Sequence, residues 1–238
     1  MSDRCVVGPV ELRLGRYQDV LADVGMVDLV CCDPPYGART HGGQRHRRTD
    51  GSEAISIQMH PIPYDGWSAT DVAEFVREWS GRASGWFCAF TSHDLVPVYM
   101  QELEARGRYV FAPIACVQHG MNIRLAGDGP SNWTTWLVVA RPRTMRGWGT
   151  LPGAYHGAPF DEGESTVTSS KRIAPGGKPT WLMRAIVSDY SRPGDLVVDI
   201  GSNDGTLLKH FKSRGADVCG IEPCEEIATE ARRGGRGG

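Results

Sequence analysis

The stretch Val27-Asp28-Leu29-Val30-Cys31-Cys32-Asp33-Pro34-Pro35-Tyr36 decides the fold of this chain. Its apolar first part predicts a buried β-strand, and its two prolines predict that the strand ends abruptly. Each proline fixes its own φ at about −65°, removes a backbone donor and keeps the preceding residue extended. We therefore expect Asp33–Tyr36, called the DPPY segment below, to form a stiff, extended corner at the carboxyl end of a strand.

The DPPY segment carries the groups needed to hold a planar ring with an amino group. The Asp33 carboxylate and the Pro34 carbonyl can each accept one amino hydrogen, and Tyr36 can stack on the ring face. Pro35 stiffens the backbone between them. The alternative interpretation is a strand followed by a proline-rich turn with no ligand.

The composition predicts one soluble domain. A chain of 238 residues can bury one sizeable core. It has no apolar run long enough to cross a membrane and no signal peptide after Met1, so we expect a cytoplasmic protein, in a bacterial or phage-infected cell. Its seven cysteines are an odd number without metal-ligand spacing, which indicates small core residues and no metal site.

The net charge of −2 does not indicate a nucleic-acid-binding protein, but the charge is unevenly distributed. Four arginines and two histidines lie between Arg39 and Arg48, with no acid. We expect a mobile basic loop over residues 38–64, next to the DPPY segment. The alternative is an ordinary solvated surface loop.

Alternating strand and helix patterns predict an α/β fold with a mostly parallel, seven-stranded sheet and helices on both faces. Ligands of such sheets bind beyond the carboxyl ends of the strands. The expected strands are Val10–Leu14, Val27–Cys32, Gly85–Phe90, Tyr109–Val117, Trp133–Ala140, Asp195–Ile200 and Val218–Ile221. The expected helices are Ala69–Gly81, Asp94–Arg106, Thr180–Tyr190 and Gly205–Ser213.

A second chemical site is predicted between Val197 and Thr206, where a strand runs into a glycine-containing turn and a helix. The next strand ends on Glu222, an acid that can bind both hydroxyls of a ribose. The GxGxxG pattern of pyrophosphate binding is missing, and Asp199 and Asp204 would repel phosphate. An adenosine ligand with a positive centre fits better, and S-adenosyl-L-methionine is one.

With these two sites, the chain resembles the DNA amino-methyltransferases. The DPPY segment comes first and the cofactor turn late, which is the permuted order of the family's beta group. Gly177-Lys178-Pro179-Thr180-Trp181-Leu182 resembles the Lys-Pro helix start of that group, and Ser191-Arg192-Pro193-Gly194-Asp195 resembles its lead into the cofactor strand. The sequence departs from the family at Gly201, where the family has Phe, at Asn203, where it has Gly, and at Arg16, where it often has Asp.

The resemblance implies a Rossmann-like class I methyltransferase domain over residues 1–231, followed by a disordered tail over 232–238. It implies catalysis by Asp33, Pro34, Pro35 and Tyr36. It also implies cofactor binding by Lys178, Pro179, Asp199, Gly201, Ser202, Asn203, Gly205, Thr206 and Glu222. The segment 141–177 corresponds to the family's target-recognition region, in which Arg143, Arg146, Trp148, Lys171 and Arg172 are candidate DNA contacts.

The expected substrate is double-stranded DNA, methylated on the amino group of adenine at a short site by a monomer or homodimer. The acid at the first position of the DPPY segment favours adenine over cytosine within the family. Three alternatives stay open at this point. They are cytosine-N4 methylation, methylation of RNA, a protein amide or a small molecule, and a DNA-binding homologue that has lost catalysis.

Overall fold

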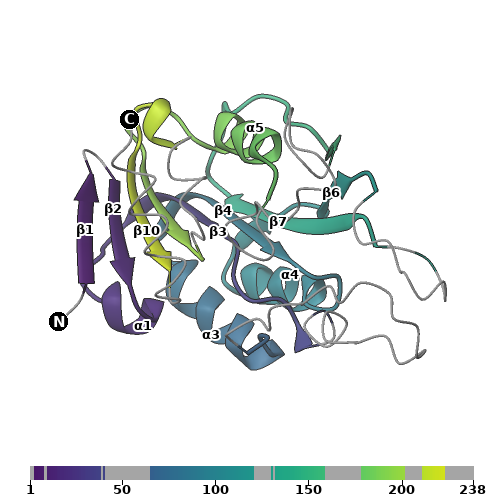
Figure 1. Cartoon of the computed structure of the whole chain (residues 1–238), viewed down its shortest axis with the longest axis horizontal. Helices are drawn as coiled ribbons and strands as arrows, with labels where there is room; N and C mark the ends of the chain where they lie inside the picture. Colours follow the sequence, from purple (N-terminus) through teal and green to yellow (C-terminus); the bar gives the residue numbers. More distant parts are fainter. Residues whose placement is uncertain are drawn as a thin grey trace, which may run out of the picture.

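The computed structural model describes residues 3–7, 10–38, 40, 65–120, 130, 132–158, 178–201 and 211–222. Within these residues the chain forms one central sheet with helices on both faces (Figure 1). The α/β fold predicted from the sequence is therefore confirmed. The expected tail 232–238 and almost all of the expected basic loop lie outside the described residues, as does most of the expected helix Gly205–Ser213.

The described strands and helices follow the predicted alternation. The strands are β1 (Asp3–Val7), β2 (Val10–Leu14), β3 (Val27–Cys32), β4 (Ala83–Thr91), β5 (Arg108–Val110), β6 (Ile114–Gln118), β7 (Thr134–Pro142), β8 (Ala154–Gly157), β9 (Leu196–Ile200) and β10 (Asp217–Glu222). The helices are α1 (Tyr17–Val20), α3 (Ala69–Trp79), α4 (Val96–Ala105) and α5 (Thr180–Tyr190).

The sheet has ten strands, not the seven that we predicted. Its order is β1-β2-β10-β9-β3-β4-β7-β6-β8, and β5 also pairs with β7. The predicted strand Tyr109–Val117 is two strands, because Pro113 cannot donate to a ladder and separates β5 from β6. The edge strands β1 and β8 carry no long apolar run and were not predicted.

The sheet is parallel in its centre, and β1 with β2, β4 with β7 and β7 with β6 pair antiparallel, whereas β8 at the edge pairs parallel with β6. Strands β2, β10, β9, β3 and β4 run parallel to one another in that order. The chain leaves β9 for β10 on one side and leaves β3 for β4 on the other. The strand order therefore reverses between β9 and β3, and this is the kind of point where open α/β sheets bind their ligands.

Two apolar cores cover the two faces of the sheet. Leu29 and Cys31 of β3 pack in the core beneath α5, and Val30 and Cys32 pack in the core beneath α1, α3 and α4. Successive side chains of a strand point to opposite faces, so a strand buried on both faces reads as a continuous apolar run. Figure 1 shows α3 and α4 on one side of the sheet and α5 on the other.

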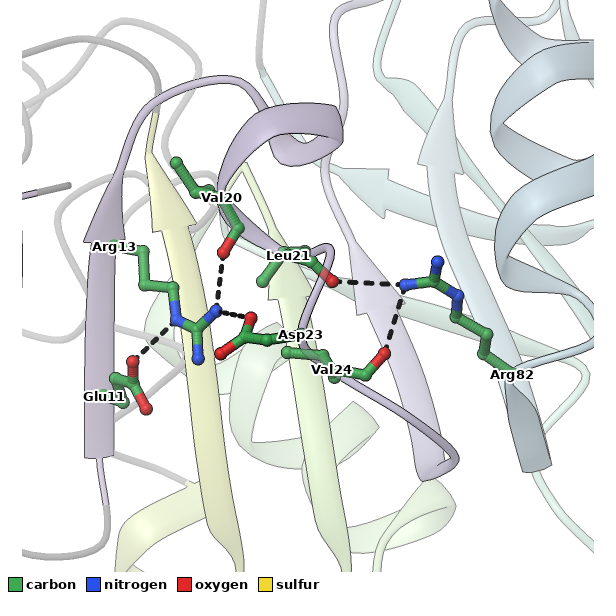
Figure 2. Close-up of polar contacts among 7 residues, drawn as sticks. All are labelled: Glu11, Arg13, Val20, Leu21, Asp23, Val24 and Arg82. Atoms are coloured by element: carbon green, nitrogen blue, oxygen red, sulfur yellow. Dashed lines mark hydrogen bonds and ion pairs between the residues drawn. The ribbon is translucent and has the colours of Figure 1, made fainter.

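Two arginines fix the chain that leads into β3 (Figure 2). Arg13 of β2 donates to Glu11 at 2.6 Å, to the carbonyl of Val20 at 2.5 Å and to Asp23. Arg82 donates to the carbonyls of Leu21 and Val24, both at 3.2 Å. These contacts hold the turn after α1, so that β3 enters the sheet in a fixed position.

Arg108 is expected to contribute strongly to stability. It is buried and donates to three backbone carbonyls, of Ser80 at 3.0 Å, of Ala83 at 2.9 Å and of Gly85. Burial lowers the pKa of Arg108 to about 10, so the guanidinium stays charged at neutral pH. We expect Arg108→Met to lower the free energy of unfolding by roughly 2–3 kcal/mol in urea denaturation, because three buried carbonyls lose their donor.

The matched control for Arg108→Met is Arg106→Met. Arg106 is exposed and pairs with Glu102 at 3.8 Å, one helical turn away. Such surface pairs contribute only about 0.3–0.5 kcal/mol. Equal losses in the two variants would contradict the structural role assigned to Arg108.

Two kinds of feature are absent from the described residues, a membrane-spanning helix and a metal-binding cluster. No helix within the described ranges is long and apolar enough to cross a membrane. The same residues contain no group of three or more His, Cys, Asp or Glu side chains that could hold a metal ion. Cys31, Cys32, Cys88, Cys116 and Cys219 are buried in the sheet, as small core residues.

Candidate active site

The DPPY segment and Gly201, which follows β9, lie side by side at the point where the strand order reverses. Cys32 at the end of β3 pairs with Ile200 at the end of β9. The backbone N–H of Asp33 donates to the carbonyl of Ile200 at 3.0 Å. The segments that begin at Asp33 and at Gly201 therefore leave the sheet from adjacent strands, as the carboxyl-end rule predicted.

Gly201 is in close contact with the backbone of Asp33. It has a φ of +79°, and a Cβ at this position would lie 2.5 Å from the Asp33 carbonyl oxygen. Both the backbone conformation and the space therefore require glycine. Gly201, which departs from the family pattern, therefore allows the backbone after β9 to lie directly against Asp33.

The Asp33 carboxylate forms a buried ion pair with Lys178. Lys178 Nζ lies 2.6 Å from Asp33 Oδ2, and the two side chains are only 7% and 12% exposed. The same ammonium lies 5.1 Å from the centre of the Tyr36 ring and 5.2 Å from that of Phe90. Lys178 lies two residues before the first residue of α5, so the start of this helix places a cation next to the acid of the DPPY segment.

Tyr36 is held by contacts on both sides. Its carbonyl accepts from the Trp67 N–H at 3.0 Å, and the next residue, Gly37, donates to Ser92 Oγ at 3.0 Å. The Tyr36 hydroxyl is buried near the Asp33 carboxylate and the Thr135 hydroxyl. Burial, followed by the charge of Asp33, raises the pKa of Tyr36 well above its ordinary value, so the hydroxyl stays protonated.

The candidate cofactor residues are described only in part. Lys178 and Pro179 lie at the start of α5, and Asp199 is fully buried in β9 beside Gly201. Glu222 ends β10, where its backbone pairs with Leu14. Ser202, Asn203, Gly205 and Thr206 lie outside the described residues, so their roles stay predictions.

Phe90 and Ser92 contribute to the site but were not predicted. Phe90 lies under the Lys178 ammonium, and Ser92 accepts from the backbone after Tyr36. Both lie where β4 ends, next to β3 in the sheet. The rule that ligands bind beyond carboxyl ends, applied to the predicted strand Gly85–Phe90, would have indicated them.

Three residues of the expected recognition segment lie at the edge of the sheet opposite Asp33. Residues 141–142 belong to β7 and 154–157 form β8, so part of this segment belongs to the sheet. Because β7 is antiparallel to β4, Arg143, Arg146 and Trp148 follow it at the edge opposite Asp33. Trp148 Nε1 donates to the carbonyl of Asp189, near the end of α5, at 2.6 Å. These three residues therefore lie away from Asp33, and their contact with DNA stays a prediction.

A cavity of about 520 Å³ lies at this opposite edge. It is lined mainly by apolar side chains, among them Trp86, Phe111, Trp148 and Leu151. Phe111 precedes β6 and Val139 is near the end of β7, so the cavity lies beyond the amino ends of the central strands. It is separate from the site at Asp33.

Solved structures share this fold at low sequence identity. M1.HpyAVI in complex with SAM is 18% identical, with a TM-score of 0.66, and the match covers 94% of this chain and 98% of that one. The cytosine-N4-specific PvuII DNA methyltransferase is 11% identical, with a TM-score of 0.64 over 93% of this chain and 84% of that one. TTHA0409 from Thermus thermophilus, assigned as a DNA modification methylase, is 17% identical, with a TM-score of 0.61 over 94% of both chains.

The chain has the fold of these DNA methyltransferases. The Rossmann-like methyltransferase fold expected from the resemblance is thus confirmed, over nearly the whole length of both chains. No protein-family model and no curated protein matches the sequence. The likeness to these solved proteins is therefore one of fold.

Proposed function

We propose that this protein transfers a methyl group from S-adenosyl-L-methionine to the exocyclic amino group of adenine in double-stranded DNA. The observation that carries the proposal is the contact between Gly201 and the backbone of Asp33 at the reversal point of the sheet. This contact supports the proposal because Asp33, which would bind the amino group, lies next to Gly201, where the cofactor-binding turn would begin. Similar folds in DNA methyltransferases, one of them in complex with SAM, support the same reaction.

The residues present fit this cofactor. Gly201 has no side chain to fill the space beside Asp33, and Asp199 places a buried carboxylate at the end of the neighbouring strand. Acidic surroundings suit a sulfonium cation and oppose a phosphate ligand. Gly201, Asp199 and Glu222, with the turn that follows Gly201, would hold the cofactor. When bound, it supplies an activated methyl group.

The chain's own contribution lies in Asp33 and Pro34. The amino nitrogen of a base is a poor nucleophile, because its lone pair is shared with the ring. The Asp33 carboxylate and the Pro34 carbonyl would accept the two amino hydrogens and so favour a tetrahedral nitrogen with a free lone pair. The carboxylate would also stabilise the positive charge that develops there. The methylated amine is very acidic while charged, so no strong base is required.

The base must leave the duplex to reach Asp33, which costs a few kcal/mol. Stacking on Tyr36 would offset part of this cost. We expect Tyr36→Ala to raise the KM for DNA about tenfold, since a base–aromatic stack contributes roughly 1–3 kcal/mol. We expect Tyr36→Phe to stay within about twofold of wild type, because phenylalanine keeps the aromatic face on which the base would stack.

Steady-state kinetics with DNA as the varied substrate distinguish the two Tyr36 variants. If Tyr36→Phe were as impaired as Tyr36→Ala, the hydroxyl and not the ring face would carry the function of Tyr36.

The proposed reaction can be tested with purified protein and S-adenosyl-L-methionine labelled on its methyl group. The substrates are unmethylated bacterial DNA, total RNA and a protein extract, supplied separately. We expect label in DNA alone, and N6-methyladenine after digestion to nucleosides. N4-methylcytosine would overturn the choice of base, and label in RNA or protein alone would overturn the choice of DNA.

A further inference from the structure

We propose that the Lys178 ammonium occupies the position of the target amino nitrogen when no DNA is bound, and that it must leave before the base can enter. The inference rests on the proposed function and adds a competitor to its active site. The inference is based on two observations. Lys178 Nζ lies 2.6 Å from Asp33 Oδ2. The same Nζ lies 5.1 Å from the centre of the Tyr36 ring and 5.2 Å from the centre of the Phe90 ring.

The ammonium has the chemical features of the nitrogen undergoing methylation. Both carry N–H donors for the Asp33 carboxylate, and both are positively charged, the base nitrogen only as the methyl group arrives. Both also gain from a nearby aromatic face, here that of Tyr36. A site that stabilises a cationic nitrogen attracts any such group, and Lys178 is held close to it by the chain itself.

The ammonium and the target nitrogen exclude each other. They would share one carboxylate oxygen and one aromatic face, and two nitrogen atoms cannot fill the same space. A cation left beside Asp33 would also repel the positive charge that develops on the base. Since both side chains of the ion pair are nearly buried, solvent would screen this repulsion only weakly.

Lys178 is suited to leaving. Its charge is at the end of a flexible four-carbon chain, and it lies just before α5 rather than inside it. An ammonium that leaves Asp33 becomes available to an anionic group of the cofactor, which is the role that the resemblance gives to Lys178. The ion pair therefore belongs to the protein without DNA, and the cofactor role would belong to the complex.

The first test measures the ion pair without any substrate. Urea unfolding is compared for wild type, Lys178→Met, Asp33→Asn and the double variant. We expect the double variant to be more stable than the two single effects predict, by at least about tenfold in the unfolding equilibrium constant. Additive effects would show that the pair does not form and would overturn the inference.

The second test measures displacement by DNA. At saturating S-adenosyl-L-methionine, Lys178→Met should raise kcat/KM for unmethylated bacterial DNA about tenfold, because no charge-assisted hydrogen bond has to be broken. Lys178→Arg, which keeps the charge, should show no such gain. The control Lys212→Met removes an exposed lysine outside the site and should match wild type. An unchanged or lower kcat/KM in Lys178→Met would overturn the inference.

The two tests separate the inference from the proposed function. A wild-type protein that methylates no DNA overturns the proposed function, and with it the proposal that Lys178 occupies the position of the target nitrogen. If the wild type is active but the Lys178 and Asp33 variants have additive effects on unfolding, only the proposal about Lys178 is overturned.

Discussion

Asp33→Ala is expected to lower kcat for DNA methylation by about a hundredfold to a thousandfold. The variant loses the carboxylate that accepts an amino hydrogen and stabilises the positive charge on the base nitrogen. Removing a single group that stabilises transition-state charge typically costs about 10²–10³ in kcat. Binding of S-adenosyl-L-methionine should survive, because Gly201 lies against the Asp33 backbone carbonyl, which alanine keeps. Methylation kinetics and calorimetric titration measure the two effects separately.

The control for Asp33→Ala is Asp19→Ala, which removes an exposed carboxylate from α1. This variant should retain wild-type kinetics. Substantial methylation by Asp33→Ala would remove the proposed mechanism, whatever the activity of the wild type.

Gly201→Ala is expected to lower the free energy of unfolding by roughly 3 kcal/mol or more. A residue with a side chain at a φ of +79° costs about 1–3 kcal/mol. Its Cβ would also lie 2.5 Å from the Asp33 carbonyl oxygen. That oxygen cannot move away easily, because the Asp33 N–H is bonded to Ile200 in the neighbouring strand. Urea denaturation measures the loss, and methylation should fall with it because the DPPY segment is displaced.

Gly215→Ala separates backbone conformation from steric contact. Gly215 has a nearly identical φ of +80°, but the nearest atom to its Cβ would be Pro193 Cβ at an ordinary 3.8 Å. This variant should lose only the conformational part, about 1 kcal/mol. If the two variants were equally destabilised, the close contact between Gly201 and Asp33 would not contribute.

The best-predicted elements are those buried by a regular apolar pattern. Strand Val27–Cys32 and helix Thr180–Tyr190 have the same bounds in the structure as in the prediction. In the helix, Leu182, Met183, Ile186 and Val187 recur at helical spacing and are all buried. Edge strands lack this signal: in β8 only Tyr155 is buried, and in β1 Val6 is 60% exposed.

The parts of the site that lie at the carboxyl ends of parallel strands could be predicted from the sequence. The parts whose position depends on the direction of a strand could not. The proximity of Asp33 to Gly201 follows from two parallel strands that end at the same edge. The position of Trp148 depends on β7 being antiparallel, which apolar periodicity does not encode. The ion pair between Lys178 and Asp33 joins residues 145 positions apart, and only the packing of α5 on the sheet brings them together.

The central claim is that the acid of the DPPY segment and the neighbouring glycine turn act together to methylate an amino group of DNA. Its most direct test is to express the wild type and Asp33→Ala in a bacterial host without DNA methylation. The host DNA is then sequenced by a method that reports modified bases. We predict N6-methyladenine at one short recurring sequence with the wild type, and none with Asp33→Ala. Unmodified DNA from cells that contain folded wild-type protein, or the same modification with both proteins, would contradict the claim.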